Sequence, residues 1–337
     1  MLNNISEPDS IKISLIVPVF NRPQEIFELL ESLANQTDKD FELVIVEDGS
    51  SETCENEIEK FKEILDIKYF YKPNTGPGIT RNYGFERCSG NYGIFLDSDC
   101  IIPPQYISTV KNALRIHYVD AFGGPDKADK SFSLLQKSID YTMTSFITTG
   151  GIRGASQKMD KFYPRSFNMG ISRKVFETTG GFPAARFANS KAAGEDIELS
   201  INIYKAGFKI GLIKDAYVFH KRRTSLKQFF KQVYNFGFAR VTLSKRNKGT
   251  LKMVHLLPSL FTIGSIFLIM LAIFISRLCL LPLALVLVLI FIDALIRKKS
   301  ILIGALALVT SLIQLYGYGI GFIIGWWRLY ILNKNNS

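Results

Sequence analysis

Three long apolar stretches near the end of the sequence constrain the fold more than any other feature. They cover residues 253–276, 278–296 and 301–327. With histidine counted as neutral, the only charged residue within them is Asp293. Because the hydrocarbon core of a bilayer is ~30 Å thick and takes about 20 helical residues to cross, each stretch is long enough, or nearly so, to span a membrane. The sequence therefore predicts three transmembrane helices over 253–327 and a polar tail over 328–337, with buried soluble helices as the alternative.

Basic side chains are concentrated just before these stretches. The chain has a net charge of +11 at pH 7, but residues 1–204 carry 22 basic and 28 acidic side chains, whereas residues 205–252 carry 13 basic side chains and one acidic side chain. A basic band between an acidic segment and an apolar tail suits an anionic membrane surface. No RNA- or DNA-binding motif accompanies it. We therefore expect a membrane, and no nucleic acid, among the partners of this chain.

The basic residues also predict how the chain is oriented. The basic band precedes the first apolar stretch, and residues 297–299 (RKK) separate the second from the third. The positive-inside rule places both on the cytoplasmic side and the turn around Arg277 outside, so that the last span exits. Residues 1–10 are polar and partly acidic, unlike a secretion signal. The sequence predicts a multi-pass protein of the cell (inner) membrane whose N-terminal domain is cytoplasmic.

The N-terminal part of the chain alternates between strand and helix patterns. Short apolar runs rich in β-branched residues predict strands, and apolar residues at helical spacing predict helices between them. Strands are expected at 13–20, 41–46, 67–71 and 92–96, and helices around 26–33 and over 78–87. This order implies parallel strands, and open sheets of this kind bind ligands beyond the carboxyl ends of their strands. Asp48, Asp97 and Asp99 follow strands at that edge.

Asp97 and Asp99 are the most specific local signal. In an extended chain, residues two apart point to the same side, so both carboxylates face one way and Ser98 faces the other. Carboxylate oxygens at a strand end suit Mg²⁺ or Mn²⁺, which proteins often hold together with substrate phosphates. A solvated strand end is the alternative.

The order of the motifs resembles that of family 2 glycosyltransferases of the GT-A fold. The motifs lie at residues 14–21 (SLIVPVFN), 46–50 (VEDGS), 76–84 (GPGITRNYG), 95–99 (FLDSD), 167–170 (FNMG), 180–182 (GGF) and 194–196 (GED). The resemblance covers about residues 11–240. It implies an α/β fold, with a Rossmann-like mixed sheet of the nucleotide-diphospho-sugar transferase type over 1–224, followed by a C-terminal helical membrane region.

The resemblance implies a nucleotide-sugar site. Asp48 resembles the carboxylate that hydrogen-bonds the nucleotide base, with an Asp-Gly turn as the alternative. Arg81 would pair with a phosphate or orient the acidic pair, and a structural ion pair is equally open. Arg222 would clamp the diphosphate, or else supply charge at the membrane surface. The other residues implied in donor binding are Pro18, Val19 and Asn21 in the wall of the base pocket, and Asp97, Ser98, Asn168, Met169 and Arg223.

The resemblance also implies a metal site and a catalytic base. Asp97 and Asp99 look like ligands of Mn²⁺ or Mg²⁺, and His220 would complete the metal shell or lie on the surface. Asp196 resembles the base that takes the proton of the acceptor hydroxyl in an inverting transfer. Glu195 resembles a neighbour that supports the site or contacts the acceptor. An N-cap of the following helix is the alternative for Asp196, and both roles could coexist.

Two segments lie outside these motifs. Between 126 and 165 the resemblance fades. The apolar side chains at 141–147 and the glycines at 150–154 fit either a mobile acceptor loop or, more simply, core plus turn. Residues 225–252 are predicted as a basic amphipathic segment at the membrane interface, with a helix packed on the catalytic domain as the alternative. An interfacial segment would bring the site to the bilayer, which favours a lipid-linked acceptor.

These inferences lead to one functional hypothesis. We expect a membrane-anchored, metal-dependent, inverting glycosyltransferase that moves one sugar from a nucleotide-diphosphate sugar to a hydroxyl of a lipid-linked saccharide or glycolipid in cell-envelope polysaccharide synthesis. The Q-x-x-R-W motif of processive synthases is absent after His220, which favours transfer of a single sugar. Two alternatives stay open: a polyprenyl-phosphate glycosyltransferase, whose acceptor needs no base, and a non-catalytic nucleotide-sugar-binding scaffold or sensor.

Overall fold

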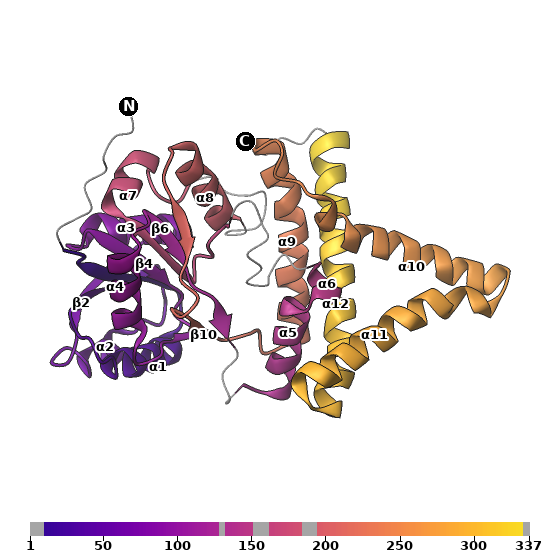
Figure 1. The fold of residues 1–337 in the computed structure, drawn as a ribbon, viewed down its shortest axis with the longest axis horizontal. Helices are drawn as coiled ribbons and strands as arrows, with labels where there is room; N and C mark the ends of the chain where they lie inside the picture. Colours follow the sequence, from indigo (N-terminus) through magenta and orange to yellow (C-terminus); the bar gives the residue numbers. More distant parts are fainter. Residues whose placement is uncertain (1–9, 128–131, 151–161, 184–193, 333–337) are drawn as a thin grey trace. The chain divides into compact units, whose positions relative to one another are not determined.

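The chain divides into two compact units, each assembled from segments that are separate in the sequence. The computed structural model describes residues 10–127, 132–150, 162–183 and 194–332. Unit 1 contains Met1–Asp129, Lys158–Ala185 and Glu195–His220, and unit 2 contains Lys130–Gln157, Arg186–Gly194 and Lys221–Ser337. Unit 1 is an α/β fold and unit 2 is helical (Figure 1).

A mixed seven-stranded sheet forms the centre of the described part of unit 1. Its strand order is β3-β2-β1-β4-β8-β6-β9. The strands are β1 (Ile13–Val19), β2 (Phe41–Asp48), β3 (Asp66–Lys72), β4 (Tyr92–Leu96), β6 (Ala121–Gly123), β8 (Asn168–Ser172) and β9 (Ile210–Leu212). β3, β2, β1 and β4 are mutually parallel, and β8 runs antiparallel to both of its neighbours. The predicted α/β fold with a mixed sheet is confirmed.

Helices cover both faces of this sheet because successive residues of its strands point to opposite sides. Leu15 and Val17 of β1 belong to the core cluster of α1 (Pro23–Ala34) and α4 (Tyr106–Ile116). Ile16 belongs instead to the cluster on the other face. The helices of that face are α3 (Pro77–Arg87), α7 (Arg173–Thr179) and α8 (Glu195–Lys205). The short helix α2 (Glu55–Glu59) follows β2.

A second sheet of three short strands carries the end of unit 1 back to the acidic pair. β10 (Val218–His220) pairs antiparallel with β5 (Cys100–Ile101) and parallel with β7 (Asp126–Lys127). The register places His220 opposite Cys100, which directly follows Asp99. This pairing brings together two parts of the chain that are more than a hundred residues apart in the sequence.

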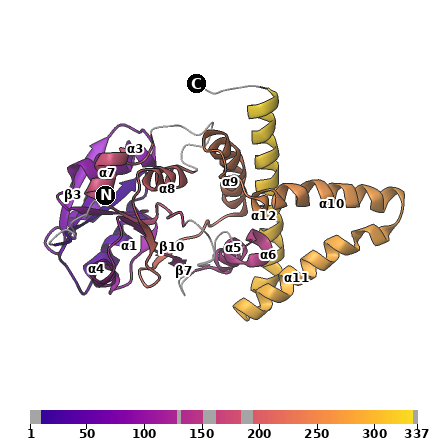
Figure 2. The ribbon, with the colours of Figure 1, turned by 45° about the horizontal axis from the view of Figure 1, so that its top comes forward.

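Unit 2 consists of helices packed around the long helix α12 (Ile301–Trp326), as Figures 1 and 2 show. The other helices are α5 (Leu134–Thr144), α6 (Phe146–Thr149), α9 (Leu226–Arg246), α10 (Leu257–Phe274) and α11 (Leu281–Lys298). Short turns follow α9, α10 and α12: η1 (Met253–His255), η2 (Arg277–Leu280) and η3 (Trp327–Ile331). By length and composition, Leu257–Phe274, Arg277–Lys298 and Ile301–Ile331 are able to cross a membrane.

The two segments without motifs both contribute helices to unit 2. In α5, Tyr141 and Met143 are buried, whereas Phe146 and Ile147 of α6 are exposed. The expectation of core therefore holds for Tyr141 and Met143 and fails for Phe146 and Ile147, and residues 151–154 of the same prediction lie outside the described residues. Helix α9 packs lengthwise on α12, because four glycines along this interface leave room for close backbone approach. Its apolar face is therefore covered by another apolar helix.

Candidate active site

The acidic pair and His220 converge where β4 ends. Asp97 and Asp99 follow Leu96, the last residue of β4, and His220 is the last residue of β10. The His220 Nε2 atom lies 3.0 Å from Asp99 Oδ1 and 3.8 Å from Asp97 Oδ2. The imidazole ring stacks on Phe167, with ring centroids 4.6 Å apart. The structure thus brings together the three side chains that the sequence analysis singled out as metal ligands.

This donor set fits a divalent cation such as Mn²⁺ or Mg²⁺. Two carboxylates and one imidazole nitrogen face one another, and hard or borderline divalent ions accept such ligands. The Cys100 sulfur is also close, since its Sγ and the donor atoms of Asp99 and His220 lie within 4.8 Å of one another. Burial raises the pKa of the Cys100 thiol well above its ordinary value. Thiol sulfur is a soft donor, whereas Mn²⁺ and Mg²⁺ prefer oxygen ligands, so Cys100 is a less suitable ligand for these ions than the carboxylates.

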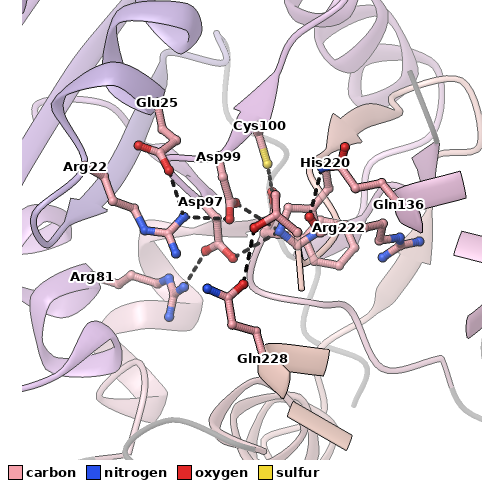
Figure 3. A network of polar contacts seen from close by, with 12 residues as sticks. Arg22, Glu25, Arg81, Asp97, Asp99, Cys100, Gln136, His220, Arg222 and Gln228 are labelled. Atoms are coloured by element: carbon pink, nitrogen blue, oxygen red, sulfur yellow. Dashed lines mark hydrogen bonds and ion pairs between the residues drawn. The ribbon is translucent and has the colours of Figure 1, made fainter. Parts of the chain in front are cut away.

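Two arginines balance the charge of the acidic pair. Arg81 Nη2 donates to Asp97 Oδ1 at 2.6 Å, and Arg22 Nη1 donates to Asp99 Oδ2 at 2.9 Å. Figure 3 shows both guanidinium groups on one side of the carboxylates and His220 on the other. The Arg81 side chain is buried and lies over the Phe182 ring. Arg81 is thus ion-paired with Asp97, and its expected role toward a phosphate or the acidic pair stays a prediction.

Arg22 is a site residue that the sequence analysis missed. It directly follows Asn21 and precedes α1, so its position at the carboxyl edge of the sheet was readable from the sequence. The pairing of Arg22 with Asp99 was not readable from the sequence, because Asp99 lies 77 residues further along the chain. Arg22 and Arg81 together place two positive charges beside the acidic pair, where a diphosphate would be attracted.

Asp48 ends β2 and is held by the next loop. Its Oδ1 accepts hydrogen bonds from Lys72 Nζ and from the Thr75 N–H, and its Oδ2 accepts one from the Gly76 N–H at 2.9 Å. Burial by itself would raise the pKa of Asp48, but these donors bring it below its ordinary value. The predicted base contact stays a prediction.

Asn21 shapes the loop between β1 and α1. Its backbone is left-handed, with φ of 53°. The Asn21 side-chain oxygen accepts from the N–H groups of Ser51 and Glu52 at 2.8 and 3.1 Å, which ties this loop to the one after β2. Val19, which is buried, and Pro18, which is half-buried, end β1 just before this loop. Pro18, Val19, Asn21 and Asp48 therefore lie near one edge of the sheet, at the ends of the adjacent strands β1 and β2.

Glu195 and Asp196 begin α8 and have different surroundings. The Asp196 Oδ2 atom lies 3.5 Å from Arg165 Nη1, and 15% of its side chain is exposed. Glu195 is buried, and its carboxyl group lies against the Cα of Gly78, where no side chain would fit. Burial raises the pKa of Glu195 to about 7, against the lowering effect of Arg81. Asp196 is thus the reachable carboxylate of the two.

Five other predicted donor-binding residues are placed as follows. Ser98, Asn168 and Met169 are buried in unit 1, and the Asn168 amide is hydrogen-bonded to the Tyr106 hydroxyl at 2.6 Å and to the Ala216 carbonyl at 2.8 Å. Arg222 is buried in unit 2, where its Nη2 donates to Asp140 Oδ1 at 3.0 Å. Arg223 is half-buried in unit 2. Their contacts with a donor remain predictions, and for Arg222 the observed partner is a carboxylate of its own unit.

Comparisons with known proteins indicate a glycosyltransferase family. The profile of the family described as "Glycosyl transferase family 2" matches residues 14–180. A relative from Campylobacter jejuni, named GalNAc(5)-diNAcBac-PP-undecaprenol beta-1,3-glucosyltransferase, is 33% identical over 204 residues, which are 58% of this chain and 60% of that protein. An uncharacterized glycosyltransferase of Rickettsia bellii is 43% identical over 88 residues, which are 26% of this chain and 13% of that protein. The matched segments thus cover less than two thirds of these relatives.

Among solved structures, the fold is similar to that of the mannosyltransferase PcManGT from Pyrobaculum calidifontis, determined in complex with GDP-Man and Mn²⁺. The TM-score is 0.59 at 17% sequence identity, and the match covers 91% of this chain and 88% of that one. At this identity the likeness concerns the fold alone. It shows that the mixed sheet described above is of the GT-A type.

Proposed function

Because residues 14–180 belong to glycosyl transferase family 2, we propose that this protein transfers one sugar from a nucleotide-diphosphate sugar to a hydroxyl group of a lipid-linked saccharide or glycolipid. The observation that carries the proposal is the convergence of Asp97, Asp99 and His220 beside Arg22 and Arg81. Such a set of ligands and positive charges suits a divalent ion together with a diphosphate.

The donor would lie along the carboxyl edge of the sheet. Asp48 and the loop of Pro18, Val19 and Asn21 would contact the nucleoside, since they lie at the ends of the adjacent strands β2 and β1. Asp97, Asp99 and His220 would hold the divalent ion, whose positive charge stabilises the departing diphosphate. Arg81 keeps Asp97 in place through its guanidinium group, whose planar geometry matches that of a carboxylate. Arg22 would exchange Asp99 for a phosphate oxygen when the donor enters.

Asp196 is the proposed base. It would accept the proton of the acceptor hydroxyl while that oxygen attacks the anomeric carbon from the face opposite the diphosphate, which inverts the configuration. Its partial exposure supports this role, because an acceptor has to reach the carboxylate. Glu195, which is buried against Gly78, would hold the start of α8 in position.

A lipid-linked acceptor is proposed from the composition of unit 2. Three of its helices are able to cross a membrane by length and composition, and the residues before them carry a strong positive charge. A catalytic unit on the same chain would work at a membrane surface, where lipid-linked saccharides lie. The name of the Campylobacter jejuni relative refers to an undecaprenol-linked saccharide as the acceptor of that enzyme. We propose the inner membrane as the location, with the catalytic unit on the cytoplasmic side.

The decisive experiment measures nucleoside diphosphate release by the full-length protein in detergent. A panel of nucleotide sugars is supplied with Mn²⁺ or Mg²⁺, with and without membrane lipid extract. Asp99→Ala and Asp196→Asn are compared with Glu63→Gln, which changes an exposed acidic residue of unit 1. We expect release from one donor, dependent on the extract, to be lost in the first two variants and kept in the third.

Three other results would redirect the proposal. Turnover that survives Asp196→Asn would indicate an acceptor that is already ionised, such as a polyprenyl phosphate. Donor binding without turnover in any lipid extract would indicate a nucleotide-sugar sensor. Release that is unaffected by Asp99→Ala would contradict the proposed metal site.

A further inference from the structure

Helix α12 differs from the two apolar helices before it in how much protein surrounds it. No residue from Thr310 to Gly325 is exposed. In α10, by contrast, the buried residues are Ser259, Thr262 and Ser265, all in its first half, and in α11 they are Ile290 and Ala294 in its second half. The far halves of α10 and α11 therefore carry apolar side chains that no described part of unit 2 covers.

The second half of α12 is covered by a charged helix. Gly317 packs against Val233, Gly321 against Tyr234 and Gly325 against Phe238, so α9 follows α12 in the same direction. Near the end of both helices, Lys245 Nζ donates to the Leu329 carbonyl at 3.2 Å. Along this path α9 also carries Lys227, Lys231, Arg240 and Arg246. Any bilayer crossed by α12 would therefore have to accommodate the charges of α9 as well.

The first half of α12 is covered by polar groups of α5 and α6. Thr142 and Thr310 are hydrogen-bonded through their hydroxyl groups at 2.7 Å. Gln314 donates to the carbonyl oxygens of Thr142 and Thr148 at 3.2 and 3.1 Å. These bonds hold α5 and α6 on the side of α12 that would otherwise face lipid.

A largely buried ionic cluster lies in the second half of α5. The Asp140 carboxylate accepts from Arg222 Nη2 at 3.0 Å and from Lys298 Nζ at 2.8 Å. Lys298 ends α11, just before α12 begins. Charged groups thus accompany α12 at both of its ends and along its second half.

The geometry of α10 and α11 separates them further from α12. Gly304 of α12 packs on Phe291 of α11, whereas Gly319 packs on Pro258 at the start of α10. These two contact points are ~22 Å apart at 1.5 Å per residue, and α10 and α11 are each ~27 Å long. Their other ends are joined by η2. The two helices therefore diverge from this turn, and α12 closes the open side, as Figures 1 and 2 show.

We propose that α10 and α11 form a hairpin that inserts into a lipid bilayer, while α12 lies along the membrane surface between the hairpin and the charged helices α5 and α9. The residues after Trp326 then stay on the same side as the catalytic unit. This differs from the sequence-based expectation that the third apolar stretch exits across the membrane. It concerns membrane topology and does not depend on the transferase activity.

The distribution of side chains supports this arrangement. Charged residues are costly in hydrocarbon, so helices that carry them along one face lie at the interface. Trp326, Trp327 and Tyr330 at the end of α12 are exposed aromatic residues of the kind that gather at the headgroup level. Leu281, Leu285 and Leu289 are exposed along the first half of α11, as a hairpin surrounded by lipid requires.

The test uses the sidedness of single cysteines in sealed membrane vesicles. Cys54, Cys88 and Cys100 are buried, and Cys279→Ser removes the remaining native thiol. In this background, Arg328→Cys reports on the end of α12 and Glu63→Cys reports on the catalytic unit; both positions are exposed. A membrane-impermeant maleimide is added to vesicles of either orientation. Trp327→Cys repeats the measurement at a second exposed position, in case one variant folds poorly.

We expect Arg328→Cys and Glu63→Cys to be labelled in the same vesicle preparation and protected in the other. Labelling of the two in opposite preparations would overturn the proposal, because α12 would then cross the bilayer. Protection of both Arg328→Cys and Trp327→Cys in both preparations would also overturn it, since α12 would then end in hydrocarbon. Native Cys279 in η2 gives a second readout: labelling from the side of the catalytic unit would exclude an inserted hairpin.

Discussion

The buried carboxyl group of Glu195 gives a sharp prediction about pH-dependent stability. Burial raises its pKa to about 7, while the unfolded chain has a pKa close to 4.5. Between these values the folded state binds more protons than the unfolded state, so stability is full below pH 4.5 and falls as the pH rises towards 7. For a single group with these two pKa values, linkage gives a loss of about 2.5 kcal/mol between pH 5 and pH 8.

Glu195→Gln removes this titration and keeps the shape of the side chain. The melting temperature of the wild-type protein in detergent, without added metal, should fall relative to that of the variant by about 5–10 °C between pH 5 and pH 8. The fixed cost of burying an amide cancels in this difference between two pH values. Glu63→Gln serves as the control, because Glu63 is exposed. Parallel pH profiles for wild type and Glu195→Gln would refute the reasoning.

Three further predictions concern the metal site and the helical unit. His220→Ala should weaken Mn²⁺ binding about tenfold or more in calorimetric titration. Cys100→Ser should leave Mn²⁺ binding unchanged, because thiol sulfur is a soft donor and Mn²⁺ prefers oxygen ligands; equal effects of the two variants would contradict this ligand assignment. Arg22→Ala should strengthen the binding of Mn²⁺ in the absence of a nucleotide several-fold, because Asp99 loses the guanidinium group that competes with the metal ion. An unchanged affinity would count against competition between Arg22 and Mn²⁺ for Asp99. Gly321→Leu should separate α9 from α12 and thereby destabilise the protein by about 2 kcal/mol or more in thermal melts. Gly264→Leu should not destabilise it, because nothing lies within 4 Å of a Cβ at Gly264. Similar losses of stability in the two variants would argue against the close packing of α9 on α12.

The sequence predicted the parallel part of the sheet, β1 to β4, because its signals are local, but it did not predict β6, β8 and β9. β1, β2 and β4 are buried runs of β-branched and aromatic residues, and their observed bounds differ from the expected ones by two residues at most. The acidic pair was also readable, since Asp97 and Asp99 directly follow β4. That His220 joins this pair depends on the antiparallel register of β10 with β5, which links distant segments. For His220, the resemblance to a family supplied what local pattern alone does not.

Other features were not readable because they depend on partners far along the chain. Nothing local indicates that Arg22 pairs with Asp99, or that Arg222 pairs with Asp140 rather than lying open to a phosphate. The polar residues of α5 and at its end also have distant partners. Ser138, Thr142 and Ser145 form hydrogen bonds with Ile303, Thr310 and Asp293, which lie in helices 140 or more residues later in the sequence. Hydropathy alone likewise does not distinguish α12 from α10 and α11.

The interleaving of the two units has a practical consequence for anyone who wants a soluble enzyme. Cutting the chain after His220 would remove the apolar C-terminal helices, but it would leave α5 and α6 behind, inserted between β7 and β8. Ile139, Tyr141 and Met143 would then lose the helices that cover them and face water. The shortened protein would expose a new apolar surface and would precipitate. A soluble fragment requires an internal deletion of residues 130–157 as well as truncation after His220.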